Sequence, residues 1–357
     1  MRKVRILFVV CVVAVLAFTL AILSGCKTTT TTETTATAET TAVAAETTTT
    51  VSAETTSKPE AKDVNIIVVG VNWQHPYWAD VTKGVEYAKK ALGINLTIVG
   101  PMDVNWQGEA DALEQAIGQK PTGIMVAAFD PTIVPSIKKA IEAGIPIVTF
   151  ESDIKESGRL CFIGVNNYDY GIQLGKNLIE ASGEKGTLAI STNAGAANSE
   201  LRIQGLKDFL KDYPSWEIVG QTEDKADIQT GANAAKALLQ THPDLTAYIG
   251  INASSGPAIA TAAKEMGVTD KLTILCCDRD NTTLDLIKEG VIKSSVAAKT
   301  VSTPYWAAVV LINYVESGRD IPITNDNEKA KVVTMPDNIY TGAVVITKEN
   351  VDLFYQQ

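Results

Sequence analysis

From residue 63 onward, short apolar runs of strand length alternate with longer segments in which apolar residues recur at helical spacing. This alternation predicts parallel β-sheets with helices on both faces. The runs predict ten strands, at residues 65–71, 96–100, 123–129, 145–150, 161–165, 187–192, 217–221, 247–251, 272–277 and 293–298. Ten strands suit two sheets better than one, so the pattern predicts an α/β fold of two Rossmann-like, doubly wound lobes.

Amphipathic segments lie between these runs and predict the helices. They include residues 78–92, 133–143, 168–181, 201–212, 228–239 and 257–266. Gly and Pro residues stand at many of the joins, as in the stretch 142–146, and mark where one element ends and the next begins.

Residues 1–62 follow a different pattern. Three positive charges in residues 1–5 precede an apolar run over residues 6–23, which is the layout of an export signal, although a run of about 18 apolar residues also suffices to span a bilayer. Residues 23–26 read Leu-Ser-Gly-Cys and resemble the bacterial lipobox, in which a lipid is attached to the Cys. We therefore expect residues 1–25 to be a lipoprotein signal peptide and Cys26 to carry a lipid anchor.

The segment between Cys26 and the folded part is almost entirely Thr, Ala, Glu and Ser. Such a composition buries too little apolar surface to offset the entropy of ordering, so residues 26–62 are predicted to form a lipidated, disordered tether. The expected location is outside the cytoplasm, on the outer face of the cytoplasmic membrane or in the periplasm of a two-membrane bacterium.

Composition removes several classes of function. The 357 residues are 45% hydrophobic and 20% charged, as in ordinary globular proteins, and the formal net charge of −10 argues against a nucleic-acid partner. The chain has two histidines, and its five cysteines form no C-x-x-C pair. A zinc site or a Ser/His/Asp triad would depend on one isolated histidine, so we expect no metal, no cofactor and no catalytic residue.

Polar and aromatic side chains follow the predicted strands, and doubly wound sheets bind ligands at the carboxyl ends of their strands. The residues at these ends are Asn72, His75, Tyr77, Trp78, Asp130, Glu151, Ser152, Asp153, residues 193–202, residues 224–227, Asn252, Asp278, Arg279 and Lys299. Trp73 and Trp106 also follow strands and are further candidates for the cleft. Carboxylates, amides and Arg bind hydroxyl groups, and aromatic rings pack on C–H faces, so this set suits a polyhydroxylated ligand.

Several phrases at these strand ends carry a family resemblance. They are NWQHPYW from Asn72, GIPIVTFESD from Gly144, FIGVNN from Phe162, RIQG from Arg202, and the pair Cys277 and Asp278. With them, the folded part resembles the type I periplasmic binding proteins, in particular the ribose- and galactose-binding branch that serves sugar ABC transporters.

The resemblance implies two lobes in the periplasmic binding protein-like I fold, joined by a hinge that the chain crosses three times. The crossings are expected near residues 164–167, near residues 298–303 and within the last thirty residues. The N-terminal lobe is expected to hold residues 63–165 with about 300–330, and the C-terminal lobe residues 166–299 with about 331–357.

The resemblance also implies ligand contacts and selects ten residues from these strand ends: Asn72, His75, Tyr77, Trp78, Glu151, Ser152, Arg202, Asn252, Asp278 and Lys299. Tyr77 and Trp78 fall where the family stacks aromatic rings on the sugar, and Glu151 falls where Asp is usual. Two positions depart from the family: Ala226 replaces a frequent aromatic residue, and Lys299 replaces a common Gln. Lys299 opens the possibility of an acidic sugar, a polyol or a sugar phosphate, unless it pairs with Glu151 or Asp278.

We therefore expect a monomeric solute-binding lipoprotein, and not an enzyme, that captures a sugar or sugar-like polyol between its lobes and delivers it to a membrane ABC permease. One alternative is a receptor that reports a sugar or autoinducer to a signalling partner. A less favoured alternative is a glycoside-acting enzyme, for which Glu151 and Asp278 are the available pair of carboxylates.

Overall fold

The computed structural model describes residues 63–355. The expected signal peptide, the lipid anchor on Cys26 and the Thr-rich tether lie outside the described residues. All ten predicted strands are present with slightly different bounds, and two further short strands follow near the C-terminus.

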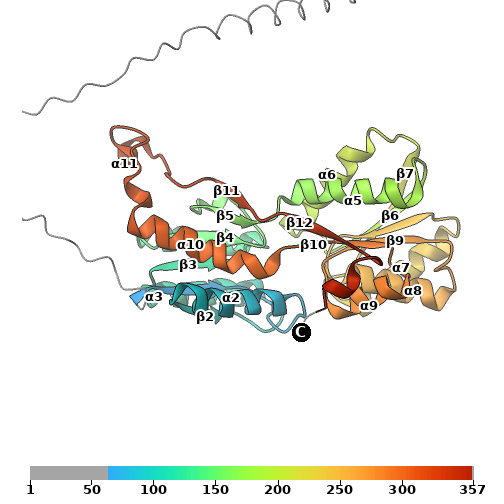
Figure 1. Ribbon diagram of the computed structural model, residues 1–357, viewed down its shortest axis with the longest axis horizontal. Helices are drawn as coiled ribbons and strands as arrows, with labels where there is room; N and C mark the ends of the chain where they lie inside the picture. Colours follow the sequence, from blue (N-terminus) through green and yellow to red (C-terminus); the bar gives the residue numbers. More distant parts are fainter. Residues whose placement is uncertain (1–62, 356–357) are drawn as a thin grey trace, which may run out of the picture. The chain divides into compact units, whose positions relative to one another are not determined.

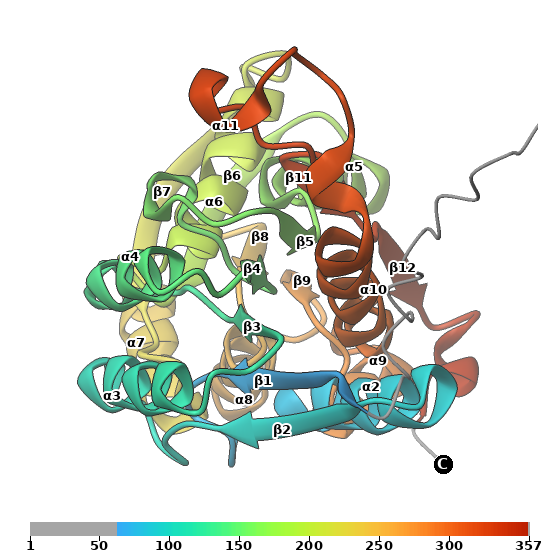
Figure 2. The ribbon, with the colours of Figure 1, turned by 90° about the vertical axis from the view of Figure 1, so that its left-hand side faces the viewer.

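The first sheet has six strands in the order β11-β5-β4-β3-β1-β2, and all its pairings are parallel. Its strands are β1 (Asn65–Val69), β2 (Asn95–Val99), β3 (Gly123–Val126), β4 (Ile147–Phe150), β5 (Phe162–Gly164) and β11 (Asn338–Tyr340). Figure 2 shows two helices on each of its faces: α3 (Trp106–Gly118) and α4 (Val134–Glu142) on one, α2 (Trp78–Leu92) and α10 (Thr303–Glu316) on the other. We call this sheet with these helices the first lobe.

The second sheet also has six strands, in the order β12-β10-β9-β8-β6-β7. Its strands are β6 (Gly186–Thr192), β7 (Trp216–Glu223), β8 (Ala247–Gly250), β9 (Thr273–Cys277), β10 (Ser294–Ala298) and β12 (Ala343–Thr347), of which β12 alone runs antiparallel to its neighbour. The helices α5 (Asn167–Ser182) and α6 (Ala197–Leu210) cover one face, and α7 (Ile228–Thr241), α8 (Ser255–Met266) and α9 (Asn281–Glu289) cover the other (Figure 1). We call this group the second lobe.

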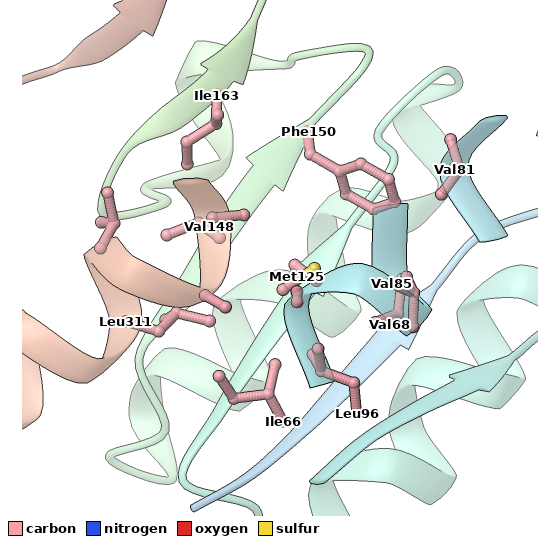
Figure 3. Packing of buried hydrophobic residues seen from close by; sticks show 14 of the residues in the cluster. Ile66, Val68, Val81, Val85, Leu96, Met125, Val148, Phe150, Ile163 and Leu311 are labelled. Atoms are coloured by element: carbon pink, nitrogen blue, oxygen red, sulfur yellow. The ribbon is translucent and has the colours of Figure 1, made fainter. Parts of the chain in front are cut away.

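The apolar pattern explains how the helices attach to the sheets. In α2, Trp78, Val81, Val85 and Ala88 recur at intervals of three and four residues and are all buried, which forms one stripe toward the core. Figure 3 shows Val81 and Val85 of α2 with Leu311 of α10 against the buried side chains of the first sheet. The helix ends where Gly93 adopts a left-handed conformation, with φ of 68°.

Strand order locates the ligand-binding edge of each lobe. In the first lobe the chain proceeds from β1 outward to β2 on one side and to β3, β4 and β5 on the other. The second lobe repeats this arrangement about β6, with β7 on one side and β8, β9 and β10 on the other. The switch points therefore lie beside β1 and β6, and ligands bind such sheets outside the carboxyl ends of the strands.

The chain passes between the two sheets three times. It does so between β5 and α5, between β10 and α10, and between β11 and β12. The short helix α11 (Asn327–Ala330) lies before β11 and therefore precedes the last crossing. The expected boundary at residue 330 differs from the structure, because β11 still pairs with β5 and the chain reaches the second sheet only at β12. A three-residue strand is too short to show an alternating pattern in the sequence.

Candidate ligand-binding site

A cavity of about 110 Å³ is lined by residues of both lobes. The first lobe contributes Val71, Asn72, His75, Tyr77, Trp78, Val104, Trp106 and Phe129, and the second contributes Asn193, Ala196, Asn198, Ser199, Arg202, Ala226, Asn252, Ala253, Ser254 and Asp278. Most of these residues follow the carboxyl ends of strands or stand at the start of the helix that comes next. The cavity therefore lies where the strand order places it.

Seven of the ten expected ligand-binding residues line this cavity, and three do not. The seven are Asn72, His75, Tyr77, Trp78, Arg202, Asn252 and Asp278. Glu151, Ser152 and Lys299 are not part of its lining.

Three of the expected residues have a left-handed backbone conformation, which residues other than Gly rarely adopt. Asn72 has φ of 59°, Glu151 of 62° and Asp278 of 68°. Each follows a strand, namely β1, β4 or β9, where the chain leaves the sheet. Strained backbone of this kind is often found at functional sites, and two of the three positions, Asn72 and Asp278, line the cavity.

Arg202 supplies the positive charge of the cavity, and its position is fixed within the second lobe. Its Nε donates to Oδ1 of Asn167 at 2.9 Å and its Nη1 donates to the carbonyl of Ile251 at 2.9 Å. The guanidinium also lies 4.2 Å from the ring centroid of Tyr170. Burial disfavours its charge, but neighbouring groups, Asp278 among them, raise the pKa of Arg202 overall, so it remains a cation.

Asp278 supplies the negative charge of the cavity. Asp278 is 7% exposed, and burial raises the pKa of its carboxyl group to about 6. The nearby positive charge of Arg202 acts to lower this pKa. At neutral pH the cavity therefore holds one anion and one cation from the same lobe. Together they offer strong acceptors and donors for hydroxyl groups without a large net charge.

Glu151 lies behind the cavity wall and acts on Tyr77. The Tyr77 hydroxyl donates to Oε2 of Glu151, while Oε1 of Glu151 is buried without a hydrogen-bond partner. Burial raises the pKa of Glu151 to about 7. Glu151 therefore orients the Tyr77 ring.

Asn252 is held by a carboxylate outside the cavity lining. Its Nδ2 donates to both oxygens of the buried Asp224, at 2.9 and 3.0 Å, and its Oδ1 accepts from the backbone N–H of Ser254 at 2.9 Å. Asp224 also accepts from the backbone N–H of Ala226 at 2.9 Å. One carboxylate thus fixes two parts of the wall, Asn252 and Ala226.

Two polar contacts join the lobes beside the cavity. His75 Nε2 lies 3.2 Å from Ser254 Oγ, and Arg279 binds Asp80 through Nε at 2.9 Å and Nη2 at 2.7 Å. Burial lowers the pKa of His75, so its imidazole is neutral at pH 7. These contacts form only when the two lobes are close together.

Comparison with known proteins agrees with this architecture. A family model described as "Periplasmic binding protein domain" matches residues 66–320. The chain belongs to the periplasmic binding protein family. The expected family, type I, and the expected two-lobed α/β fold are confirmed.

Several relatives of this periplasmic binding protein have names that state a ligand. The chain is 23% identical to the D-allose-binding periplasmic protein of Escherichia coli (strain K12) over 276 residues, which cover 74% of this chain and 88% of that protein. It is similar to the structure of a sugar-binding protein of a sugar ABC transporter from Bacillus halodurans, with a TM-score of 0.75, 29% identity and coverage of 82% and 100%.

A solute binding protein from Burkholderia graminis C4D1M, solved in complex with D-arabinose, gives a TM-score of 0.75 and 26% identity and covers 83% of this chain and 99% of its own. These relatives are binding proteins rather than enzymes.

Lys299 and Ser152 were expected to contact the ligand, but neither lines the cavity of this periplasmic binding protein. Lys299 is exposed at the second crossing, where its Nζ lies beside Gly342, and no ion pair joins it to Glu151 or Asp278 in the described part of the chain. It follows the end of β10 and enters a short 3₁₀ turn, which carries its side chain away from the cavity. Ser152 is fully buried, and its hydroxyl has no hydrogen-bond partner.

Some lining residues lacked a clear signal in the sequence. The sequence pattern predicts that Phe129 lies within a strand, whereas β3 ends at Val126 and Phe129 lines the cavity. Val104 and Ser254 lie in loops with no distinguishing motif. Trp106, a lesser candidate, lines the cavity from the first position of α3.

None of the helices between residues 63 and 355 is long and apolar enough to span a bilayer. Nor do His, Cys, Asp and Glu side chains gather there in a group of three that could hold a metal ion.

Proposed function

We propose that this periplasmic binding protein captures a neutral sugar or sugar-like polyol in the cavity between its lobes. The observation that carries the proposal is the cavity lining itself, in which Arg202 and Asp278 stand with the amide of Asn252 and with aromatic rings of the first lobe. Vicinal hydroxyl groups both donate and accept, so they suit one guanidinium, one carboxylate and one amide at the same time.

Charge favours a neutral ligand. Arg202 and Asp278 are the fully charged groups of the lining, and their charges offset each other. Lys299, which had suggested an acidic sugar or a sugar phosphate, lies outside the lining. An anionic ligand would enter a buried site with no additional cation to neutralise it, which is costly.

The printed names of the relatives support the same class of ligand. One is a D-allose-binding protein, and another was solved with D-arabinose. We extend the proposal to delivery of the bound sugar to a membrane ABC permease and to a location outside the cytoplasm, held by a lipid on Cys26. The supports are the relatives named as ABC transporter binding proteins and the lipobox at residues 23–26.

Calorimetric titration of the purified chain with pentoses, hexoses, polyols and sugar acids tests the proposal. A neutral sugar should bind with micromolar or tighter affinity, and Asp278→Asn and Arg202→Gln should each weaken it at least a hundredfold while the fold is retained by circular dichroism. Binding of sugar acids alone, or unchanged affinity in both variants, contradicts the assignment.

The anchor has its own test. Cys26→Ser expressed in a bacterial host should move the protein from the membrane fraction to the soluble one, and mass spectrometry of the unaltered chain should find diacylglycerol on Cys26. An unmodified Cys26 in membrane-bound protein contradicts lipidation.

A further inference from the structure

The two lobes contribute different chemistry to the cavity. Its four aromatic lining residues are Tyr77, Trp78, Trp106 and Phe129, and all belong to the first lobe. Its fully charged lining residues, Arg202 and Asp278, both belong to the second lobe, whose share of the lining contains no aromatic ring. A ligand between the lobes therefore meets all the aromatic rings of the lining on one side and both of its charges on the other.

The aromatic residues do not have equal freedom to contact a ligand. Trp78 is 4% exposed and packs against the rings of Trp73, Tyr77, Phe129 and Phe150, at centroid distances of 4.5 to 6.3 Å. Its surface is therefore largely used within the core.

Trp106 retains more surface and has a defined position. It is half-buried at the first residue of α3, and the preceding Asn105 caps that helix by accepting from the backbone N–H of Gly108 at 2.8 Å. An indole is the largest aromatic side chain, and the cap holds the backbone from which it projects. Tyr77 and Phe129 are half-buried as well, but both pack against the ring of Trp78, at centroid distances of 5.4 and 6.2 Å. No such ring contact engages Trp106 in the described part of the chain, so Trp106 is the best placed ring for stacking on a ligand.

The second lobe offers no ring of its own to the cavity. Ala226 lines the cavity with only a methyl group, and its left-handed backbone, with φ of 56°, is held by the hydrogen bond to Asp224. A sugar ring in this cavity can thus stack on an aromatic side chain through one face only.

Sugar rings differ in how their faces are composed. In a pyranose with all hydroxyls equatorial, axial C–H bonds occupy both faces. One axial hydroxyl makes its own face polar and leaves the C–H bonds of the opposite face for contact with an aromatic ring.

We propose that Trp106 is a specificity-determining residue that stacks on the C–H face of a neutral pyranose, and that the cavity selects rings with one axial hydroxyl over all-equatorial rings. The proposal rests on the proposed sugar-binding function and narrows it to a class of ring. The polar face of the ring is directed toward Arg202 and Asp278 of the second lobe.

Calorimetric titration with matched pairs of epimers tests this preference. D-Galactose and D-glucose differ only in the orientation of one hydroxyl, as do L-arabinose and D-xylose in their pyranose forms, and D-allose adds an axial hydroxyl at another carbon. In each pair the axial epimer should bind at least tenfold more tightly. Equal binding, or tighter binding of D-glucose and D-xylose, overturns the inference but leaves sugar binding intact, whereas absence of binding by every sugar overturns both.

Variants of Trp106 separate stacking from a structural role. Trp106→Ala should weaken the preferred epimer about 10- to 100-fold, the range expected for loss of a stacked ring, and should bring the ratio between epimers close to one. Trp106→Phe should restore most of the affinity and the preference. Trp306→Ala is the matched control, because Trp306 is 47% exposed on α10 and lies outside the cavity.

A reciprocal variant tests the same idea from the other lobe. Ala226→Phe places a ring on the second wall, at a backbone conformation that a non-Gly residue already occupies. It should improve the binding of all-equatorial sugars relative to their axial epimers. Unchanged affinities in Trp106→Ala, together with an unchanged epimer ratio in Ala226→Phe, overturn the assignment of Trp106.

Discussion

The ion pair between Arg279 and Asp80 bridges the lobes, and its removal should weaken ligand binding without touching the cavity wall. Arg279 follows β9 in the second lobe, and Asp80 lies in the first turn of α2 in the first lobe. Neither residue lines the cavity. Since the pair can form only when the lobes are close, it stabilises the closed arrangement over an open one.

The size of the effect follows from the burial of the two side chains. The Arg279 side chain is 23% exposed and that of Asp80 is 8% exposed, so the pair is neither a surface pair nor a fully buried one. Coulomb attraction at about 4 Å is about 4 kcal/mol with an effective dielectric of 20, and desolvation offsets most of it. Exposed pairs contribute about 1 kcal/mol or less, so we expect about 1 to 2 kcal/mol here.

This free energy translates directly into affinity. Arg279→Gln should lower the closed-to-open ratio by a factor of about 5 to 30, since each 1.4 kcal/mol is tenfold. If ligand is held only by the closed arrangement, the apparent dissociation constant is the intrinsic one divided by the closed fraction. It rises by the same factor where open molecules predominate without ligand. Where closed molecules predominate instead, the change appears as a larger open fraction of the ligand-free protein. The thermal stability of each lobe should change little, because the pair crosses between lobes.

Calorimetry and small-angle X-ray scattering measure the two expected effects, the weaker binding and the larger open fraction. Titration gives the dissociation constant, and scattering of the ligand-free protein gives the shift toward more extended molecules. Lys288→Gln is the control, because it removes an exposed pair with Asp352, at 2.7 Å, within the second lobe. Ligand affinity within twofold of the unaltered protein in Arg279→Gln, with unchanged scattering, would refute the reasoning.

Three further predictions concern buried charge, helix packing and the hinge. The buried Oε1 of Glu109 has no hydrogen-bond partner, and burial raises the pKa of Glu109 from 4.5 to about 8. Between these two pH values the folded protein keeps a proton on Glu109 that the unfolded chain has lost, so the free energy of unfolding falls as the pH rises from 4.5 to about 8. Glu109→Gln should therefore raise the melting temperature more at pH 8 than at pH 5 in a thermal-shift assay, and an equal rise at both would contradict this. Gly171→Ala should lower the melting temperature by several degrees and weaken sugar binding. The added Cβ would overlap the backbone carbonyl of Arg202 and push α5 away from α6. Unchanged sugar affinity by calorimetry would show that Arg202 does not move. Lys299→Gln should keep sugar affinity within twofold by calorimetry, because Lys299 lies outside the cavity; a tenfold loss would return it to the site.

The strands could be predicted because each is an apolar run bounded by turn residues. The limits of this approach appear where a strand is too short or a helix starts in polar residues. Strand β11 has only three residues, and α6 begins at Ala197, ahead of the expected residue 201, because the residues before Leu201 carry no apolar period. The start of α6 instead depends on packing against α5, which only the folded chain shows.

The site could be predicted as a set of strand ends, but not the depth of each side chain. Glu151 and Asp278 both follow buried strands and look equivalent in the sequence. In the structure Asp278 lines the cavity, whereas Glu151 lies behind Tyr77 and accepts a hydrogen bond from the Tyr77 hydroxyl. Lys299 also follows a strand, yet β10 leads into the hinge rather than the cleft. Which way a chain turns after a strand depends on its backbone angles, and sequence patterns do not show these.

The hydrogen bonds around the cavity separate into two kinds. Those that hold three of its side chains act within one lobe: Arg202 is held by Asn167, Asn252 by Asp224, and Tyr77 by Glu151. Those between His75 and Ser254 and between Arg279 and Asp80 join the lobes. The side chains held in this way are positioned by their own lobe, so the closure that we propose needs only to bring two prepared walls together. Little side-chain ordering then remains to be done when a ligand binds, which removes one of the free-energy costs of binding.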